Sequence, residues 1–180
     1  MPDGAWIIRP AAIHDARAIA EVHVESYKTA YRGIFPDALL DALSVEKREV
    51  AWRDLLSAHA PPSSITIVGC EPGGGVVGFA SGGQERTGRL GCDGELYTIY
   101  LRPSAQRKGL GALLVRQFGH ELLTRGFGSV AVWVLELNPA KTFYECLGGK
   151  VIAQQPIERA GQTFIEVAYG WSSLNGFPES

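Results

Sequence analysis

Apolar residues recur at the spacing of an α-helix in several parts of the chain. One stripe lies within residues 15–31, and a second, within residues 109–125, consists of Leu110, Leu113, Leu114, Phe118 and Leu122. Such a stripe is typical of a helix that packs on a core. Together with start and stop signals such as Ser44 and Gly126, the pattern predicts helices over residues 15–31, 36–43, 45–59, 109–125 and 138–148.

Runs of β-branched and aromatic residues predict the strands. Residues 130–135 are nearly all apolar, as expected for a central strand that is covered on both faces. The glycines of residues 73–75 indicate one hairpin, and residues 159–161 indicate another. The strands that we expect are residues 6–9, 65–70, 76–81, 95–101, 130–135, 150–155 and 163–171.

The order of these elements indicates the fold class. Helices come first, then strands, with a helix on either side of strand 130–135 and a hairpin at the end, which describes a mixed α/β sheet. The chain has 180 residues, of which 46% are hydrophobic and 20% charged, enough for one sizeable core. We therefore expect a single domain over residues 1–180.

Composition excludes several classes of partner. The net charge is −2, so there is no global basic field, and we do not expect nucleic acid as a partner. No apolar run approaches the roughly 18 residues of a membrane span, and residues 1–8 lack a secretory signal pattern. We therefore expect a cytoplasmic protein that binds no membrane. The cysteines and histidines show no metal-ligand spacing, so we expect no metal and no disulfide framework.

A basic turn with two glycines joins strand 95–101 to helix 109–125. It reads Gln106, Arg107, Lys108, Gly109, Leu110, Gly111. Glycine lets a ligand approach the backbone, and the first N–H groups of a helix have no partner within it, so this turn suits a phosphate group. Arg102, Arg107 and Lys108 would add positive charge. The spacing matches neither a P-loop nor a dinucleotide fingerprint, and a turn that glycine merely tightens is the alternative reading.

The turn and a second motif together resemble the GNAT superfamily of N-acetyltransferases. The second motif is residues 138–149, Asn-Pro-Ala-Lys-Thr-Phe-Tyr-Glu-Cys-Leu-Gly-Gly. The resemblance covers about residues 65–169 and implies a mixed, mostly antiparallel central sheet flanked by helices. It also implies an acetyl-CoA-binding core over about residues 64–171, with N-terminal helices at about 14–60 that shape the acceptor site. The residues that it implies for acetyl-CoA binding are Ile99, Tyr100, Leu101, Gln106, Arg107, Lys108, Gly109, Leu110, Gly111, Ala112 and Asn138.

Glu95 is the candidate general base, because several members of the family carry a catalytic glutamate at its place. An alkyl amine has a pKa near 10.4, so only about one molecule in a thousand is the free base at pH 7, and a base helps. With a period of two, Glu95, Tyr97, Ile99 and Leu101 would share one face of the sheet. An exposed carboxylate at the end of a strand is the alternative reading of Glu95.

Tyr144 matches the family's position for the general acid that protonates the leaving thiolate of coenzyme A. A tyrosine hydroxyl has a pKa near 10, above about 8.5 for a thiol, so it stays protonated and can hydrogen-bond to the sulfur. The alternatives are a core aromatic residue for Tyr144 and a helix N-cap for Asn138. Cys146 paired with a histidine would be another nucleophile, but a structural cysteine in the apolar part of a short helix is favoured.

The sequence thus predicts an N-acetyltransferase that moves the acetyl group of acetyl-CoA to a primary amine by direct attack in a ternary complex. In the family, the segment before the first hairpin shapes the acceptor site, and here it carries His23, Glu25, Tyr27, Tyr31, Arg32, Phe35 and Asp37. This mix suits a cationic or amphipathic amine on a small molecule or peptide. Amino acids, polyamines, aminoglycosides and protein N-termini stay open, as does a homodimer. A catalytically weak acetyl-CoA-binding module for regulation or interaction is the alternative function.

Overall fold

A single seven-stranded sheet, in the order β1-β2-β3-β4-β5-β7-β6, runs through the molecule. The computed structural model describes residues 5–175 and Phe177. The strands are β1 (Ile7–Pro10), β2 (Ile65–Cys70), β3 (Val76–Gln84), β4 (Gly94–Leu101), β5 (Val130–Leu135), β6 (Lys150–Arg159) and β7 (Gln162–Trp171). β4 and β5 run parallel, and the other neighbours in the sheet are antiparallel. The predicted mixed, mostly antiparallel α/β sheet is therefore confirmed.

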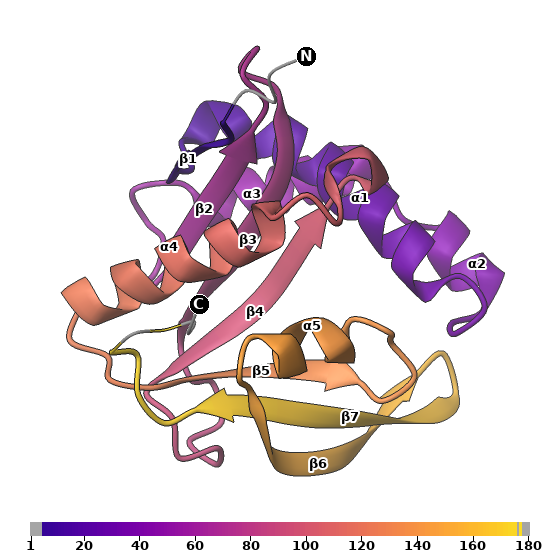
Figure 1. Ribbon diagram of the computed structural model, residues 1–180. Helices are drawn as coiled ribbons and strands as arrows, with labels where there is room; N and C mark the ends of the chain where they lie inside the picture. Colours follow the sequence, from indigo (N-terminus) through magenta and orange to yellow (C-terminus); the bar gives the residue numbers. More distant parts are fainter. Residues whose placement is uncertain (1–4, 176, 178–180) are drawn as a thin grey trace.

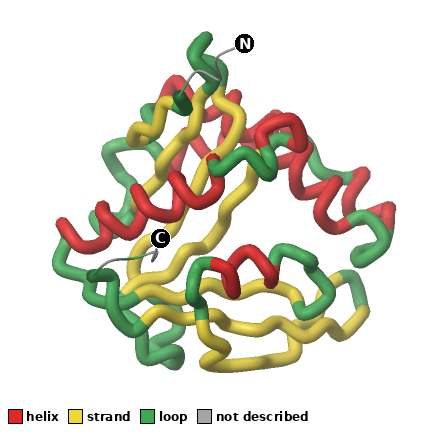
Figure 2. Tube along the Cα trace, viewed as in Figure 1, coloured by secondary structure: helices red, strands yellow, loops and turns green. Residues whose placement is uncertain are grey.

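Helices lie on both faces of the sheet (Figure 1), and Figure 2 shows the strands as the layer between them. They are α1 (Ala16–Tyr31), α2 (Asp37–Asp41), α3 (Val45–Leu55), α4 (Leu110–Thr124) and α5 (Lys141–Cys146), with short 3₁₀ turns at Ile13–Asp15 and Pro103–Ala105. α5 begins later than predicted, because Asn138 and Pro139 form a turn before it. α3 ends earlier, at Leu55, whereas β3, β6 and β7 extend beyond the predicted strands.

Two clusters of apolar side chains fill the two faces. The cluster beneath α4 includes the fully buried Leu110, Leu114 and Phe118, together with side chains of β2, β4, β5 and β7. The second cluster lies under α1 and α3 and includes Ile19, Trp52 and Phe79. One part of the predicted stripe on α4 is wrong, because Leu113 is 38% exposed.

A β-bulge in β4 breaks the predicted alternation of its side chains. Ser81 of β3 pairs with Thr98, whereas the next residue, Gly82, pairs with Leu96, so Tyr97 is the extra residue. As a result Leu96 and Ile99, three positions apart, both contact the cluster beneath α4. The prediction that Glu95 shares a face with Ile99 and Leu101 is therefore wrong.

β4 and β5 separate soon after they meet. Their parallel pairing consists of Gly94–Val130, Glu95–Ala131 and Leu96–Val132. Beyond Leu96, β4 continues along β3 while β5 continues along β7, and the two strands run apart in Figure 1. We call the space between them the β4–β5 gap.

The described residues contain no helix that is long and apolar enough to cross a membrane. Residues 1–4, part of the segment in which we expected no secretory signal, lie outside the described residues.

His23 lies at the centre of the contact between α1 and the sheet. Its ring stacks on Tyr100 with 5.1 Å between centroids, and its Nδ1 accepts a hydrogen bond from Trp52 Nε1 at 3.3 Å. Burial, with a smaller effect of the positive charge of Arg48, lowers the pKa of His23 from 6.5 to about 4. The imidazole is therefore neutral at pH 7 and serves as packing.

Acid should destabilise the protein through His23. Because the folded-state pKa is lowered, the unfolded chain binds this proton first, and stability is lost as the pH falls from about 6.5 towards 4. Between pH 7 and pH 5 this residue should remove about 2 kcal/mol from the free energy of unfolding. Urea unfolding at both pH values tests this. Between these two pH values the His23→Gln variant, which keeps an acceptor for Trp52, should lose about 2 kcal/mol less of its free energy of unfolding than the wild type. The His14→Gln variant, changed at a side chain that is 77% exposed, should behave like the wild type.

Candidate functional site

The turn before α4 presents a row of free backbone donors. None of the N–H groups of residues 107–112 donates a hydrogen bond to another described residue, and the first one of α4 to do so is Leu113, to Gly109 O at 3.2 Å. Arg107 (φ 59°) and Gly109 (φ 83°) are both left-handed. Left-handed residues in such a turn aim successive N–H groups into one concavity. We call these residues the N–H cradle, and its geometry and helix N-terminus suit an anion.

The two glycines of the cradle have different local roles. A Cβ atom on Gly109 would meet nothing within 4 Å, but the positive φ strains any other residue there. A Cβ atom on Gly111 would lie 3.2 Å from the ring of Phe143 on α5. Gly109 therefore shapes the turn, whereas Gly111 lets α5 approach α4.

The basic residues near the cradle are not equivalent. Arg107 and Lys108 are exposed and form no ion pair with a described residue. Arg102 lies 3.5 Å from Glu21 and 3.5 Å from Glu25 of α1. Two of the three predicted cations thus stay available to a ligand, and the third holds α1 against the end of β4.

The predicted cofactor residues of β4 border the gap with their backbone. Tyr100 points to His23, whereas Ile99 and Leu101 pack against the cluster beneath α4. The carbonyl of Leu101 already accepts hydrogen bonds from Ser26 Oγ at 2.9 Å and from Gln106 Nε2 at 3.0 Å. Gln106 therefore fastens the turn to the strand.

Thr98 adds an unpaired polar atom beside the gap. Its Oγ1 is buried and has no hydrogen-bond partner among the residues that the structure describes. A buried hydroxyl without a partner costs free energy. Thr98 lies two residues beyond Leu96, the last residue of β4 that pairs with β5. The free edge of β4 can therefore receive a polar ligand.

Tyr144 and Asn138 come from the α5 side of the gap. Tyr144 is 5% exposed, and its hydroxyl makes no hydrogen bond to another described residue. Burial, and to a smaller extent Tyr31 nearby, raises the pKa of Tyr144 well above its ordinary value of 10, so this hydroxyl stays protonated. Asn138 Oδ1 accepts a hydrogen bond from the N–H of Ala140 at 2.9 Å, so Asn138 caps the turn that leads into α5.

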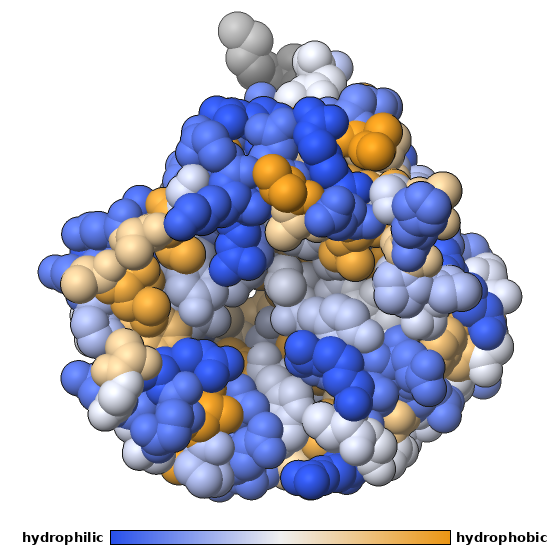
Figure 3. All heavy atoms as spheres, turned by 180° about the vertical axis from the view of Figure 1, so that it is seen from behind, coloured by the Kyte–Doolittle hydropathy of each residue, from blue (hydrophilic) through white to orange (hydrophobic). Residues whose placement is uncertain are grey.

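The face opposite α4 carries a second group of side chains. Leu96, Val132 and Val167 belong to the cluster beneath α4, so by alternation their neighbours Glu95, Trp133 and Glu166 face the other side. Glu95 lies on β4, Trp133 on β5 and Glu166 on β7. Seen from this side, the molecule has a hollow near its middle (Figure 3). The two faces of the sheet thus offer separate approaches to the gap.

Glu95 is buried in an ion pair that the sequence did not indicate. Its side chain is 1% exposed, so the alternative of an exposed carboxylate is wrong. Arg86, in the loop of residues 85–93, donates from Nε to Oε2 at 3.1 Å and from its backbone N–H to Oε2 at 3.2 Å. Its Nη2 bonds to Oε1. Arg86 follows Glu85 in a loop without any motif, so no local signal could have found this pair.

The carboxylates of the N-terminal helices are paired with arginine. Glu25 faces Arg102, and Asp37 accepts from Arg32 at 2.7 Å. The aromatic residues instead line up towards β7, because Tyr31 stacks on Phe35 and the ring of Phe35 lies edge-on to Phe164 at 5.0 Å. The acceptor segment therefore combines carboxylates that are paired with arginine and aromatic side chains that pack towards β7.

No cysteine has the surroundings of a nucleophile. Cys146 is exposed, which corrects the prediction of an apolar setting. Burial raises the pKa of the Cys70 and Cys92 thiols. Within the described part of the chain, no group of three or more His, Cys, Asp or Glu side chains could hold a metal ion.

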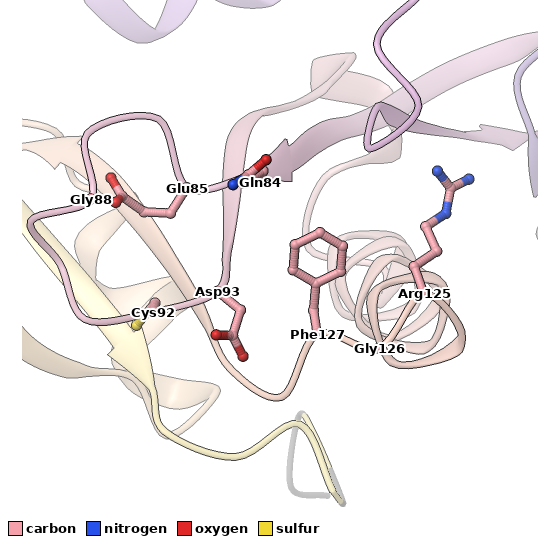
Figure 4. Close-up of a pocket in the computed structure, with 8 residues that line it drawn as sticks. All are labelled: Gln84, Glu85, Gly88, Cys92, Asp93, Arg125, Gly126 and Phe127. Atoms are coloured by element: carbon pink, nitrogen blue, oxygen red, sulfur yellow. The ribbon is translucent and has the colours of Figure 1, made fainter.

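A cavity of about 410 Å³ lies at the other end of α4, beside Arg125 and Gly126. In Figure 4 the ring of Phe127 lies between these residues and Asp93, and Glu85 points towards Gly88 within its own loop. The cradle is at the N-terminus of α4, about 20 Å away at 1.5 Å per residue. This cavity is therefore separate from the candidate site.

The chain matches one family over part of its length and one N-acetyltransferase over nearly all of it. Residues 87–157 match the family described as FR47-like protein. An uncharacterized N-acetyltransferase, YuaI, of Bacillus subtilis (strain 168) is 37% identical over 168 residues, which span 93% of this chain and 94% of the relative.

Solved structures share the fold at lower sequence identity. The PaiA N-acetyltransferase from Thermoplasma acidophilum, in complex with coenzyme A, has a TM-score of 0.69 and 21% identity, over 93% of this chain and 100% of that one. YncA from Salmonella typhimurium, with its cofactor acetyl-CoA, has a TM-score of 0.67 and 24% identity, over 94% of both chains.

Proposed function

Because this chain belongs to the GNAT superfamily of N-acetyltransferases, we propose that it moves the acetyl group of acetyl-CoA to a primary amine of a small molecule or peptide. The observation that carries this proposal is the N–H cradle of residues 107–112. Coenzyme A presents a pyrophosphate, and adjacent N–H groups at a helix N-terminus bind such an anion. Arg107 and Lys108 supply further positive charge.

The β4–β5 gap fits the rest of the cofactor. The free edge of β4 beyond Leu96 offers backbone groups to an extended chain that carries amides, and Thr98 Oγ1 offers a buried hydroxyl. The cosubstrate supplies an acetyl thioester, whose carbonyl carbon is the electrophile. In this arrangement the thioester lies near Tyr144, and the amine approaches from the face that carries Glu95.

Glu95 and Tyr144 are the proposed acid–base pair. Glu95 takes a proton from the ammonium form of the acceptor, directly or through water, and Tyr144 gives its proton to the leaving sulfur. Direct attack in a ternary complex is favoured over a covalent enzyme intermediate, because Cys70 and Cys92 have raised thiol pKa values and nothing activates the exposed Cys146. Asn138 holds the turn that positions α5.

A panel of amines tests the activity. Thiol release from acetyl-CoA should exceed background hydrolysis with at least one amino acid, polyamine, aminoglycoside, aryl amine or peptide, and the product should gain one acetyl group by mass spectrometry. Initial rates should give intersecting double-reciprocal plots, as a ternary complex requires. Tight binding of acetyl-CoA without transfer of its acetyl group to any amine would instead support a regulatory or interaction module.

Gly109→Val should weaken acetyl-CoA binding at least tenfold by calorimetry, because a branched residue disfavours the left-handed turn that aims the cradle. Gly74→Val is the matched control, since Gly74 (φ 92°) has the same strain and open surroundings in the β2–β3 turn. It should keep wild-type affinity at a similar loss of stability. If folded Gly109→Val and folded Gly74→Val bind acetyl-CoA with equal affinity, the cradle does not bind the cofactor and this part of the proposal is wrong.

Tyr144→Phe keeps the ring and removes the proton, so kcat should fall by about 10- to 10⁴-fold while acetyl-CoA affinity changes little. Tyr169→Phe is the control, because its ring centroid lies 6.0 Å from that of Tyr144 and its hydroxyl bonds to Glu145 instead. Turnover of Tyr144→Phe within twofold of the wild type would show that this residue only packs.

A further inference from the structure

The pair of Glu95 and Arg86 is unusual in its exposure. The Glu95 side chain is 1% exposed, whereas that of Arg86 is 57% exposed. Arg86 therefore reaches inward from the surface loop of residues 85–93 to a carboxylate that has almost no contact with solvent. Every hydrogen bond that the Glu95 carboxylate accepts from a described residue comes from this one residue.

The bulge of β4 holds the guanidinium in place. Arg86 lies over the ring of Tyr97, the bulged residue, with 4.5 Å between its Cζ and the ring centroid. The hydroxyl of Tyr97 donates to Gln84 O at 2.6 Å, which fixes the ring. Stacking on an aromatic face orients a planar guanidinium. The ring of Tyr97 therefore fixes the direction in which the guanidinium N–H groups of Arg86 point.

The hydrogen bonds leave one acceptor position open on Glu95. A carboxylate has about four lone-pair sites, two on each oxygen. Oε2 accepts from Nε and from the backbone N–H of Arg86, whereas Oε1 accepts from Nη2 alone. The remaining site is therefore on Oε1. Glu95 stands one pair before the last β4–β5 pair, Leu96–Val132, on the face opposite α4.

We propose that Arg86 is a positioning residue for the acetyl transfer: it orients the Glu95 carboxylate and makes Oε1 the atom that accepts the acceptor's proton. This inference rests on the proposed function, since only an amine acceptor arrives with a proton to lose. The proton moves from the ammonium nitrogen to Oε1, directly or through water, and leaves to solvent after the product departs. Arg86 itself gives up no proton.

Other charged groups near the pair do not replace Arg86. The hydrogen bonds and charge of Glu95 raise the pKa of the Arg86 guanidinium, and Tyr97 of β4 and Glu166 of β7 add smaller effects in the same direction. Burial raises the pKa of Tyr97, and the charges of Glu95 and of Glu85, in the same loop, add to this shift. Of these neighbours only Arg86 is a cation, so its removal leaves the carboxylates around the bulge without a counter-ion.

Two substitutions separate the positive charge of Arg86 from the forked array of N–H donors on its guanidinium. Arg86→Met keeps an apolar stem over Tyr97 and removes both the charge and the donors. We expect kcat to fall about tenfold, while acetyl-CoA affinity stays within twofold of the wild type. Arg86→Lys keeps the positive charge without the planar guanidinium, so kcat should recover only in part. Arg89→Met, in the same loop and without an ion pair in the described structure, should match the wild type.

A double substitution tests whether Arg86 acts through Glu95. With Glu95→Gln in place, adding Arg86→Met should lower kcat by less than twofold more, because the two residues act as one unit. If the double variant instead loses kcat by the product of the two single reductions, the proposal is overturned. An Arg86→Met enzyme that is less stable to heat but keeps the wild-type kcat, as for a purely structural ion pair, would also overturn the proposal. If Arg86→Met does not fold, an unchanged kcat in Arg86→Lys overturns it.

The wild-type enzyme separates this inference from the function on which it rests. If the wild type acetylates no amine, the proposed function fails and the inference falls with it. If the wild type acetylates an amine and Arg86→Met does so with the same kcat, only the inference fails.

Discussion

The early end of the pairing between β4 and β5 is the constraint on which the site depends. Three residue pairs join the strands, and Leu96–Val132 is the last. The bulge at Tyr97 strengthens the local twist at this point, and β4 follows β3 while β5 follows β7. An unpaired strand edge inside a sheet is costly unless something pairs with it. The fold thus contains a row of backbone groups that a bound chain can satisfy.

Packing on the two faces keeps this gap open. A Cβ atom on Gly82 would lie 2.2 Å from the carbonyl oxygen of Glu95, so glycine permits the close approach of β3 to the bulged strand. On the far side, Phe35 of the N-terminal region meets Phe164 of β7 edge-on, which joins the two halves of the sheet across the gap. Rigid contacts at both ends therefore hold two strands apart without a helix between them.

Local signals were enough to predict the sheet, α4 and the cradle. The apolar run of residues 130–135 and the turn at Gly109 each act within a few positions of the chain, so their pattern survives folding. The bulge at Tyr97 and the ion pair of Glu95 with Arg86 could not be predicted, because both depend on partners that the fold brings together. Gly82 was the available signal for the bulge, since glycine inside a strand often marks one. For the same reason the sequence predicts Arg102 as a ligand cation, because its partners Glu21 and Glu25 lie far away in the chain, on α1.

The cost of burying Glu95 bears on what the ion pair does. A buried ion pair loses much of its Coulomb attraction to desolvation, and apolar residues of similar volume are often as stable. Stability alone therefore gives no reason for a carboxylate that is 1% exposed beside the last pair of two diverging strands. An arginine that stays 57% exposed keeps part of its own hydration, so the arrangement desolvates the carboxylate more than its counter-ion. That asymmetry suits a carboxylate that must stay oriented and still take a proton from a ligand in the gap.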